Sequence, residues 1–199
     1  MPPSIDEASS FLHKFLRPER RAELFSELDR LPQTQSYYAE NSDQALLQGD
    51  GWENVDFLNV ETGVRQAIRV VILSNTCDMA WENERDVPIR MTISPLVRVS
   101  KFIDLLRRQK VDEAVIQNKL ESLRRQEISN IFYFPKGMAD DEYIIFFDDV
   151  QSQSPKTFFD KVEKKRIFSL SQPGFWYFLV KLAIHFCRAN ESVVRGADL

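Results

Sequence analysis

One short apolar run constrains the fold of this chain more than any other segment. It extends from Ile68 to Leu73 and is interrupted only by Arg69. Short continuous apolar runs are typical of a strand that is covered on both faces of a sheet. The later segment from Ile89 to Pro95 alternates apolar and polar residues, which is the pattern of a half-buried strand. The chain must therefore cover a sheet on two sides.

Helical spacing elsewhere in the sequence predicts helices that cover this sheet. We predict an α+β fold with a strongly curved, mainly antiparallel sheet or small barrel. Six glycines and 12% aromatic residues exclude a collagenous or disordered chain. We expect a single domain, 1–199, with these parts: a helical hairpin (1–32), barrel strands (48–100 and 131–170), a helical insertion (101–130) and a buried C-terminal helix (174–189).

The C-terminal helix is predicted to be buried because it is apolar around most of its circumference. Its predicted polar strip consists of Tyr177, Lys181, His185 and Arg188. Ten of the 15 phenylalanines lie from Phe132 onward. We therefore expect the C-terminal strands and this helix to share one core with the strands that precede them.

Bulk properties predict a cytoplasmic chain without a metal or other cofactor. No apolar run is long enough to span a membrane, and the first residues lack the pattern of a signal peptide. Cys77 and Cys187 are expected to be free thiols, because they lie far apart and form no close metal-binding pair. The net charge of −4 argues against broad, non-specific nucleic-acid binding.

The buried strand ends in a run of small polar or reactive residues, from Ser74 to Asp78. Cys77 could act there as a nucleophile, with Asp78 and a histidine such as His185 as partners. The alternative is a structural turn, in which side chains bond to the backbone and Cys77 is a small buried filler. The residues leave both interpretations open.

Basic residues later in the chain form a second candidate site. Lys161, Lys164, Lys165 and Arg166 include four cations and enclose one anion, and we predict that they contact phosphate groups of a nucleic acid. The acidic run from Asp140 to Glu142 is predicted to be a solvated turn.

The stretch from Gln48 to Val99 resembles the PemK/MazF-like toxins, which are SH3-like small barrels. Gly49-Asp50 precedes a first strand, arginines follow near the next loop, and Val70 to Ser74 matches the apolar strand of the family. The resemblance covers about residues 48–99 and implies metal-independent RNA cleavage. It assigns phosphate stabilisation to Arg65 or Arg69, and it places the active hydroxyl at Thr92 or Ser94. The family's Arg-Pro before the apolar strand is absent here.

The missing Arg-Pro in the loop before the apolar strand determines the leading functional hypothesis. We expect a bacterial PemK/MazF-like barrel that binds a protein or RNA in a toxin–antitoxin or phage-defence setting, without robust catalysis. One alternative is an active metal-independent endoribonuclease that uses the residues assigned by the resemblance. A second alternative is a thiol enzyme built on Cys77. No membrane partner is expected, and the sequence does not determine the oligomeric state.

Overall fold

The computed structural model describes residues 37–40, 45–80, 88–159 and 164–187 of the 199-residue chain. Within these ranges the fold is α+β and every paired strand is antiparallel, which confirms the predicted class. The predicted N-terminal helical hairpin (1–32) lies outside the described residues. So do Lys161, Arg188 and the end of the predicted C-terminal helix.

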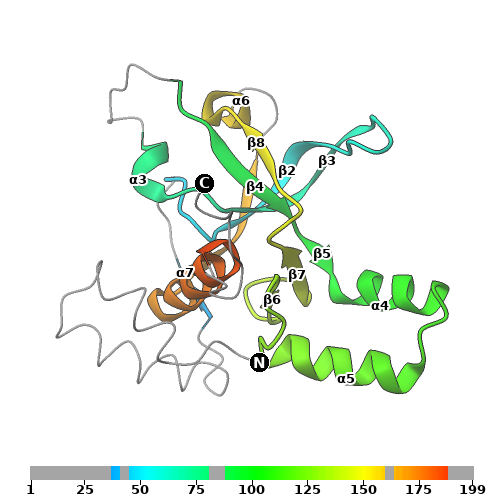
Figure 1. Ribbon diagram of the computed structural model, residues 1–199. Coiled ribbons are helices and arrows are strands. Elements are labelled where there is room, and N and C mark those ends of the chain that lie inside the picture. The colour runs from blue at the N-terminus through cyan, green and yellow to red at the C-terminus, as the bar shows by residue number, and fades with distance from the viewer. Residues whose placement is uncertain (1–36, 41–44, 81–87, 160–163, 188–199) are drawn as a thin grey trace, which may run out of the picture.

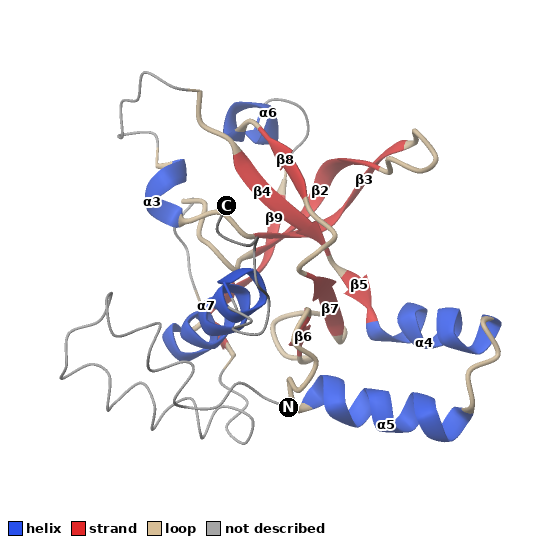
Figure 2. Ribbon diagram, viewed as in Figure 1, coloured by secondary structure: helices blue, strands red, loops and turns tan. Residues whose placement is uncertain are grey.

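The strands form two sheets (Figure 2). The larger sheet has six strands in the order β1-β9-β2-β3-β4-β8, and the smaller has three in the order β5-β7-β6. The bounds are β1 Tyr38–Ala39, β2 Gly51–Leu58, β3 Arg65–Ile72, β4 Met91–Pro95, β5 Val97–Arg98, β6 Ile131–Phe134, β7 Tyr143–Phe146, β8 Gln151–Gln153 and β9 Lys165–Leu170.

Two helices occupy the predicted insertion and project to one side of the sheets (Figure 1). Asp112 caps the second of them, because its side chain accepts a hydrogen bond from the amide of Ala114. No helix in the described ranges has the length and apolar character needed to cross a bilayer. The helices are α3 Thr76–Met79, α4 Val99–Arg108, α5 Glu113–Arg124, α6 Pro155–Phe159 and α7 Gln172–Cys187.

The C-terminal part of strand β3, from Val70, is buried on both faces, as its apolar run predicts, whereas its first residues are exposed. Val71 and Leu73 belong to the core cluster that also contains Phe178 of α7. Val70 and Ile72 face the other way and belong to a second cluster around Trp52. The four residues from Val70 to Leu73 are at most 6% exposed, so this strand is the centre of the molecule.

The C-terminal aromatic residues share the first of these cores with β3, which confirms the expectation drawn from their distribution. Phe132, Phe134, Phe147 and Phe168 are all buried beside α7, with ring centroids that lie 4.8–6.4 Å apart where they touch each other or Phe178. Aromatic rings at such distances contribute beyond the apolar area that they bury.

The predicted barrel is not closed in the described residues. The larger sheet ends in two different strands, β1 and β8, which do not pair with each other. The reason is visible at Leu96, which separates β4 from β5. There the chain leaves the larger sheet, so that Val97 and Arg98 pair with Ile144 and Tyr143 of β7 instead. The strands are shared between two open sheets rather than joined in one ring.

Lys181 of α7 is buried, although the helical pattern predicted that it would lie on a polar strip. It is 2% exposed, and its ammonium group donates to four oxygens: the carbonyls of Gln126, Ile128 and Ile131 and the side-chain oxygen of Gln126. These four oxygens are called the lysine cage below. They lie in the connection from α5 to β6 and at the first residue of β6. Lys181 therefore fastens α7 to the helical insertion.

Candidate functional site

Arg69 is the best-positioned of the residues that the resemblance assigned to catalysis, and it is fully engaged. Its Nη1 donates to both carboxylate oxygens of Asp140, at 2.7 and 2.9 Å, and to the hydroxyl of Tyr143. Its Nη2 lies 3.3 Å from a carboxylate oxygen of Glu53. The guanidinium also lies over the Tyr143 ring, 5.7 Å from its centroid. Arg69 is thus held by acidic and aromatic neighbours on several sides.

Asp140 is the centre of this cluster. The Tyr143 hydroxyl donates to it at 2.7 Å, and Arg98 Nη2 lies 3.9 Å from its other oxygen. The hydrogen bonds from Arg69 and Tyr143 hold the pKa of Asp140 below its usual value. Arg69, Arg98, Tyr143 and Asp140 are called the arginine–tyrosine cluster below. The sequence predicted a solvated turn here, whereas Asp140 joins β3, β5 and β7.

The two candidate hydroxyls lie on β4 and do not meet Arg69. Ser94 is fully buried, pairs in register with Val71 and donates to the carbonyl of Phe146 at 3.1 Å. Thr92 lies opposite Leu73, whose amide donates to its carbonyl. Leu73 is four positions beyond Arg69, which corresponds to about 13 Å along a strand. Arg65 is exposed at the start of β3, further still from Thr92.

Cys77 and Asp78 lie in the short helix α3, directly after the buried strand. Asn75 caps this helix by accepting a hydrogen bond from the Cys77 amide at 2.9 Å, so the predicted side-chain-to-backbone turn is present. The thiol of Cys77 is exposed, and the prediction that it is a buried filler is wrong. His185 lies with its Nε2 3.8 Å from Asp148 and its ring against Phe147.

The basic cluster divides into residues with different surroundings. Lys165 is exposed and pairs in register with Glu53. Lys164 lies over the ring of Phe158, with its ammonium 5.5 Å from the centroid. Arg166 points inward, since its side chain is 11% exposed and its Nη1 lies 3.1 Å from the carboxylate of Asp50. Of the three cations in this cluster that the structure describes, Arg166 is therefore directed away from the exposed surface.

Asp50 is a buried carboxylate that the resemblance includes only as part of Gly49-Asp50, without a role in the site. It is 1% exposed, and Ser169 donates to its other oxygen at 2.8 Å. The backbone on both sides fixes its position. Gly49 has a φ of +89°, and a Cβ atom on Gly51 would lie 2.5 Å from the ring of Phe168. The Gly-Asp-Gly sequence was the available signal, because a carboxylate between two glycines indicates a closely approached backbone.

A small pocket of about 180 Å³ lies beside Asp50. Gln48 forms part of its wall, and its side-chain amide donates to the carbonyl of Leu73 at 2.7 Å. Thr76 of α3 and Phe175 of α7 also line it. The pocket is thus at the junction of the buried strand's end with α3 and α7. The side chains of Gln48, Asp50 and Thr76 are bonded to other groups of the protein.

The stability of the chain is expected to depend on the protonation of Asp50. Burial raises its pKa to about 6, from 3.8, against the opposing effects of Ser169 and Arg166. Between these two pH values the folded state binds more protons than the unfolded state, so stability falls as the pH rises. The free energy of unfolding of the wild type, relative to Asp50→Asn, should fall by about 2 kcal/mol between pH 4 and pH 6.5 in urea titrations. Parallel pH profiles of the two proteins would contradict this assignment.

Comparison with known proteins gives no further assignment. Neither a scan against protein-family models nor a search of curated proteins found a match to the chain. Among the residues described by the structure, no three histidine, cysteine, aspartate or glutamate side chains gather in an arrangement that could hold a metal ion. Within the described ranges, the arginine–tyrosine cluster brings together charged side chains that lie 71 positions apart in the chain, and it does so at the surface.

Proposed function

We propose that this chain is a PemK/MazF-like binding module that holds a protein or nucleic-acid partner in a toxin–antitoxin or phage-defence setting, without robust catalysis. The antiparallel order β2-β3-β4 spans the stretch that resembles the family, and it supports the proposed relationship. One observation carries the functional part. The arginine best suited to bind a phosphate, Arg69, is occupied by Asp140, Tyr143 and Glu53.

Catalysis of RNA cleavage requires a cation aimed at the developing charge and a reacting group within hydrogen-bond distance. Neither condition is supported here. Arg69 already donates to a carboxylate, and Ser94 donates to a backbone carbonyl. Thr92 lies too far along the sheet to share a phosphate with Arg69. The geometry favours binding over chemistry.

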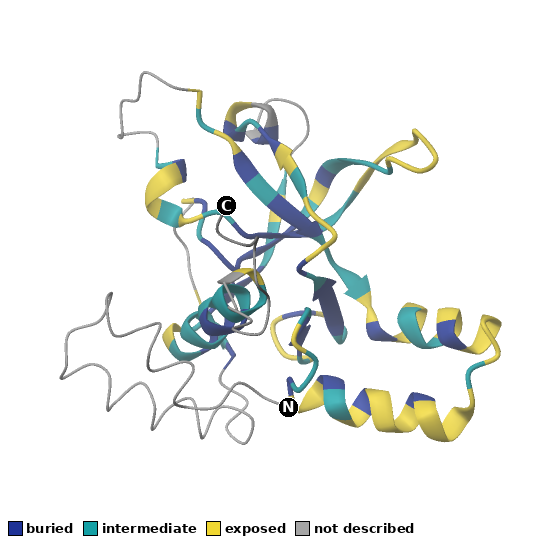
Figure 3. Ribbon diagram, in the orientation of Figure 1, coloured by how far each residue is buried: buried dark blue, intermediate teal, exposed yellow. Residues whose placement is uncertain are grey.

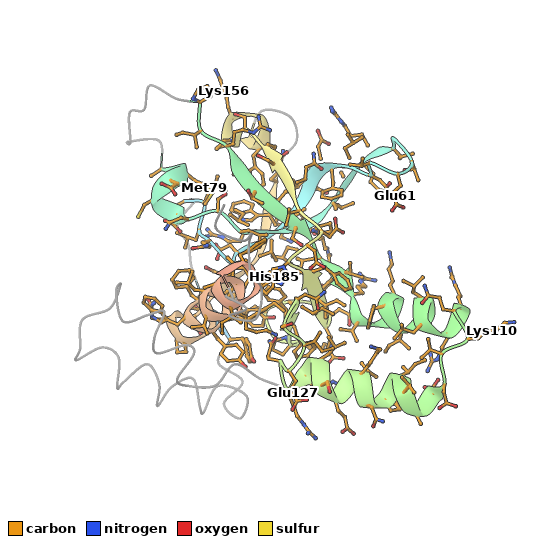
Figure 4. All side chains as sticks on the ribbon, in the orientation of Figure 1. Glu61, Met79, Lys110, Glu127, Lys156 and His185 are labelled. Atoms are coloured by element: carbon orange, nitrogen blue, oxygen red, sulfur yellow. The ribbon has the colours of Figure 1, made fainter. Side chains whose placement is uncertain are left out.

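Two exposed ends of the fold are candidate surfaces for binding a macromolecular partner. The turn between β2 and β3 carries Val60 and Val64, which are 87% and 54% exposed. Leu105 and Val115 are about half exposed on the α4–α5 pair. Figure 4 shows Glu61 and Lys110 at these two ends, both away from the centre of the molecule, and Figure 3 shows that their surroundings are exposed. Contiguous exposed apolar patches mark interaction sites, and we propose that the exposed valines and leucine at these two ends contribute to such a surface.

Incubation with RNA tests the absence of robust catalysis. The purified chain is expected to leave both structured and single-stranded RNA intact in EDTA, because Arg69 and Ser94 are bonded to the protein and Thr92 lies too far along the sheet from Arg69. The measurement is gel analysis of labelled RNA over a long incubation. Arg65→Ala and Arg69→Ala serve as matched variants, one with an exposed arginine and one with an engaged arginine.

Cleavage that disappears in Arg69→Ala or Arg65→Ala would overturn this proposal in favour of the endoribonuclease alternative. Cleavage that persists unchanged in both variants indicates a contaminating nuclease. A pull-down that recovers neither protein nor nucleic acid would count against the binding function itself.

A further inference from the structure

A carboxylate occupies a place in the arginine–tyrosine cluster that suits a larger anion. Asp140 accepts hydrogen bonds from Arg69 and Tyr143 and lies near Arg98. Guanidinium groups and hydroxyls are the donors that proteins use for phosphate oxygens, because they supply several charge-assisted hydrogen bonds in fixed directions. Asp140 accepts from Arg69 and Tyr143 and forms a longer ion pair with Arg98, at 3.9 Å.

The donors and the acceptor lie on different kinds of structure. Arg69, Arg98 and Tyr143 belong to strands β3, β5 and β7. Backbone pairing fixes Arg98 against Tyr143, and the Leu96 amide donates to the carbonyl of Arg69. Asp140 lies in the connection between β6 and β7, and its side chain is 51% exposed. Displacement of this one carboxylate toward solvent would leave the three donors in place. A strand-based donor set with an acceptor on a surface loop has the form of a site that can be opened.

We propose that Arg69, Arg98 and Tyr143 form a phosphate-binding site, and that Asp140 closes it in the free protein by taking the place of the ligand. The inference builds on the proposed binding function and names the chemistry of what is bound. Two further carboxylates face the site: Glu53 lies against Arg69, and Asp141 lies 3.5 Å from Arg98. With Asp140 in place, the negative charges outnumber the two cations. A phosphate therefore binds only when Asp140 has moved or lost its charge.

The variant Asp140→Asn tests the proposal, because it keeps the shape of the side chain and removes the competing charge. Its affinity for a short unstructured RNA and for inorganic phosphate should rise by about tenfold at low ionic strength. Fluorescence polarisation measures the first probe and calorimetry measures the second. The matched control is Asp104→Asn on α4, which removes one exposed negative charge that pairs with Arg107 and not with the cluster.

The phosphate source follows from which probe gains affinity. A gain in affinity for both probes, or for RNA alone, supports a site for the phosphodiester of a nucleic acid. A gain for RNA alone indicates in addition that the RNA contacts residues next to the site. A gain for inorganic phosphate alone supports a small phosphorylated molecule. In every case the gain should disappear in the double variant Asp140→Asn/Arg69→Gln. The variant Asp140→Ala, with a thermal unfolding curve, repeats the measurement if Asp140→Asn does not fold.

Three results would overturn the phosphate site. These are no gain for either probe in both Asp140 variants, an equal gain in Asp104→Asn, and a gain that survives Arg69→Gln. The proposed function has a different point of failure, since RNA cleavage by the wild type would contradict it and leave the affinity gain of Asp140→Asn unaffected. The two ideas are therefore tested separately.

Discussion

Replacing Lys181 with methionine is expected to lower the free energy of unfolding by about 3 kcal/mol. Methionine has a similar length, so the main loss is electrostatic. In the lysine cage the backbone carbonyls of Gln126 and Ile131 would lose the ammonium as donor. The other two oxygens keep the backbone amides of Tyr133 and Ile131 as donors. Each buried acceptor left unsatisfied costs about 1–3 kcal/mol, less where water enters. For a chain of this size the change corresponds to roughly 6–12 °C in Tm. Urea and thermal unfolding measure it.

The control for this variant is Lys119→Met, which changes the same residue type on the exposed surface of α5. Its expected effect is within about 0.5 kcal/mol. A Lys181→Met protein as stable as the wild type would show that the cage is satisfied without the ammonium group. The fastening of α7 to the α5–β6 connection would then have to come from the aromatic core alone.

The difference in stability between the wild type and Lys181→Met depends on pH, and this dependence distinguishes loss of charge from loss of packing. Burial lowers the pKa of Lys181 to about 7, from 10.5. Above the lower value the folded state binds fewer protons than the unfolded state, so the contribution of Lys181 makes stability rise with pH up to the unfolded pKa. The stability of the wild type relative to Lys181→Met should therefore increase from pH 7 to pH 9.5. A constant difference would assign the effect to packing.

Local pattern predicted the parts of the fold that depend on short-range physics. The run ending in Val70 to Leu73 indicated a strand covered on both sides, and its residues divide between two cores. The position of the phenylalanines likewise indicated a core beneath the C-terminal helix. In both cases the free energy of burying apolar side chains decides the outcome, and that quantity can be read from the residues themselves.

Barrel closure and the burial of Lys181 could not be predicted in the same way. Closure depends on where the chain turns at Leu96, and a single residue between two short strands leaves no periodic signal. Lys181 has a polar position in the helical pattern, yet its acceptors lie 50 to 55 positions earlier in the chain. A long-range partner can reverse the expected burial of a charge, because it removes the cost of desolvation.

The candidate site illustrates the same limit. Arg69 was named from the sequence, but its partner Asp140 lies 71 positions away and was assigned to a solvated turn. The acidic run had no local feature that distinguished one aspartate from the next. Asp50 and Arg166 are 116 positions apart in the sequence. They meet because β2, which begins directly after Asp50, pairs with β9, which contains Arg166.

Arg166→Met is expected to lower the free energy of unfolding by about 3–4 kcal/mol at pH 7.5, although the sequence grouped Arg166 with exposed cations. Removal of one partner from a buried ion pair leaves the other charge unpaired, and Asp50 is 1% exposed. Methionine retains apolar contact with Trp52, over which the guanidinium now lies at 5.4 Å. The neighbouring Lys165→Met is the matched control and should change stability by less than about 0.5 kcal/mol.

A second substitution and a change of pH identify the cause of that loss. Asp50→Asn removes the unpaired charge while its side-chain oxygen still accepts from Ser169, so the double variant Asp50→Asn/Arg166→Met should recover most of the stability. Lowering the pH to 5 should also reduce the effect of Arg166→Met, because burial already raises the pKa of Asp50 to about 6 and a protonated carboxyl needs no cation. An equal loss at both pH values, without recovery in the double variant, would place the contribution of Arg166 in its packing against Trp52.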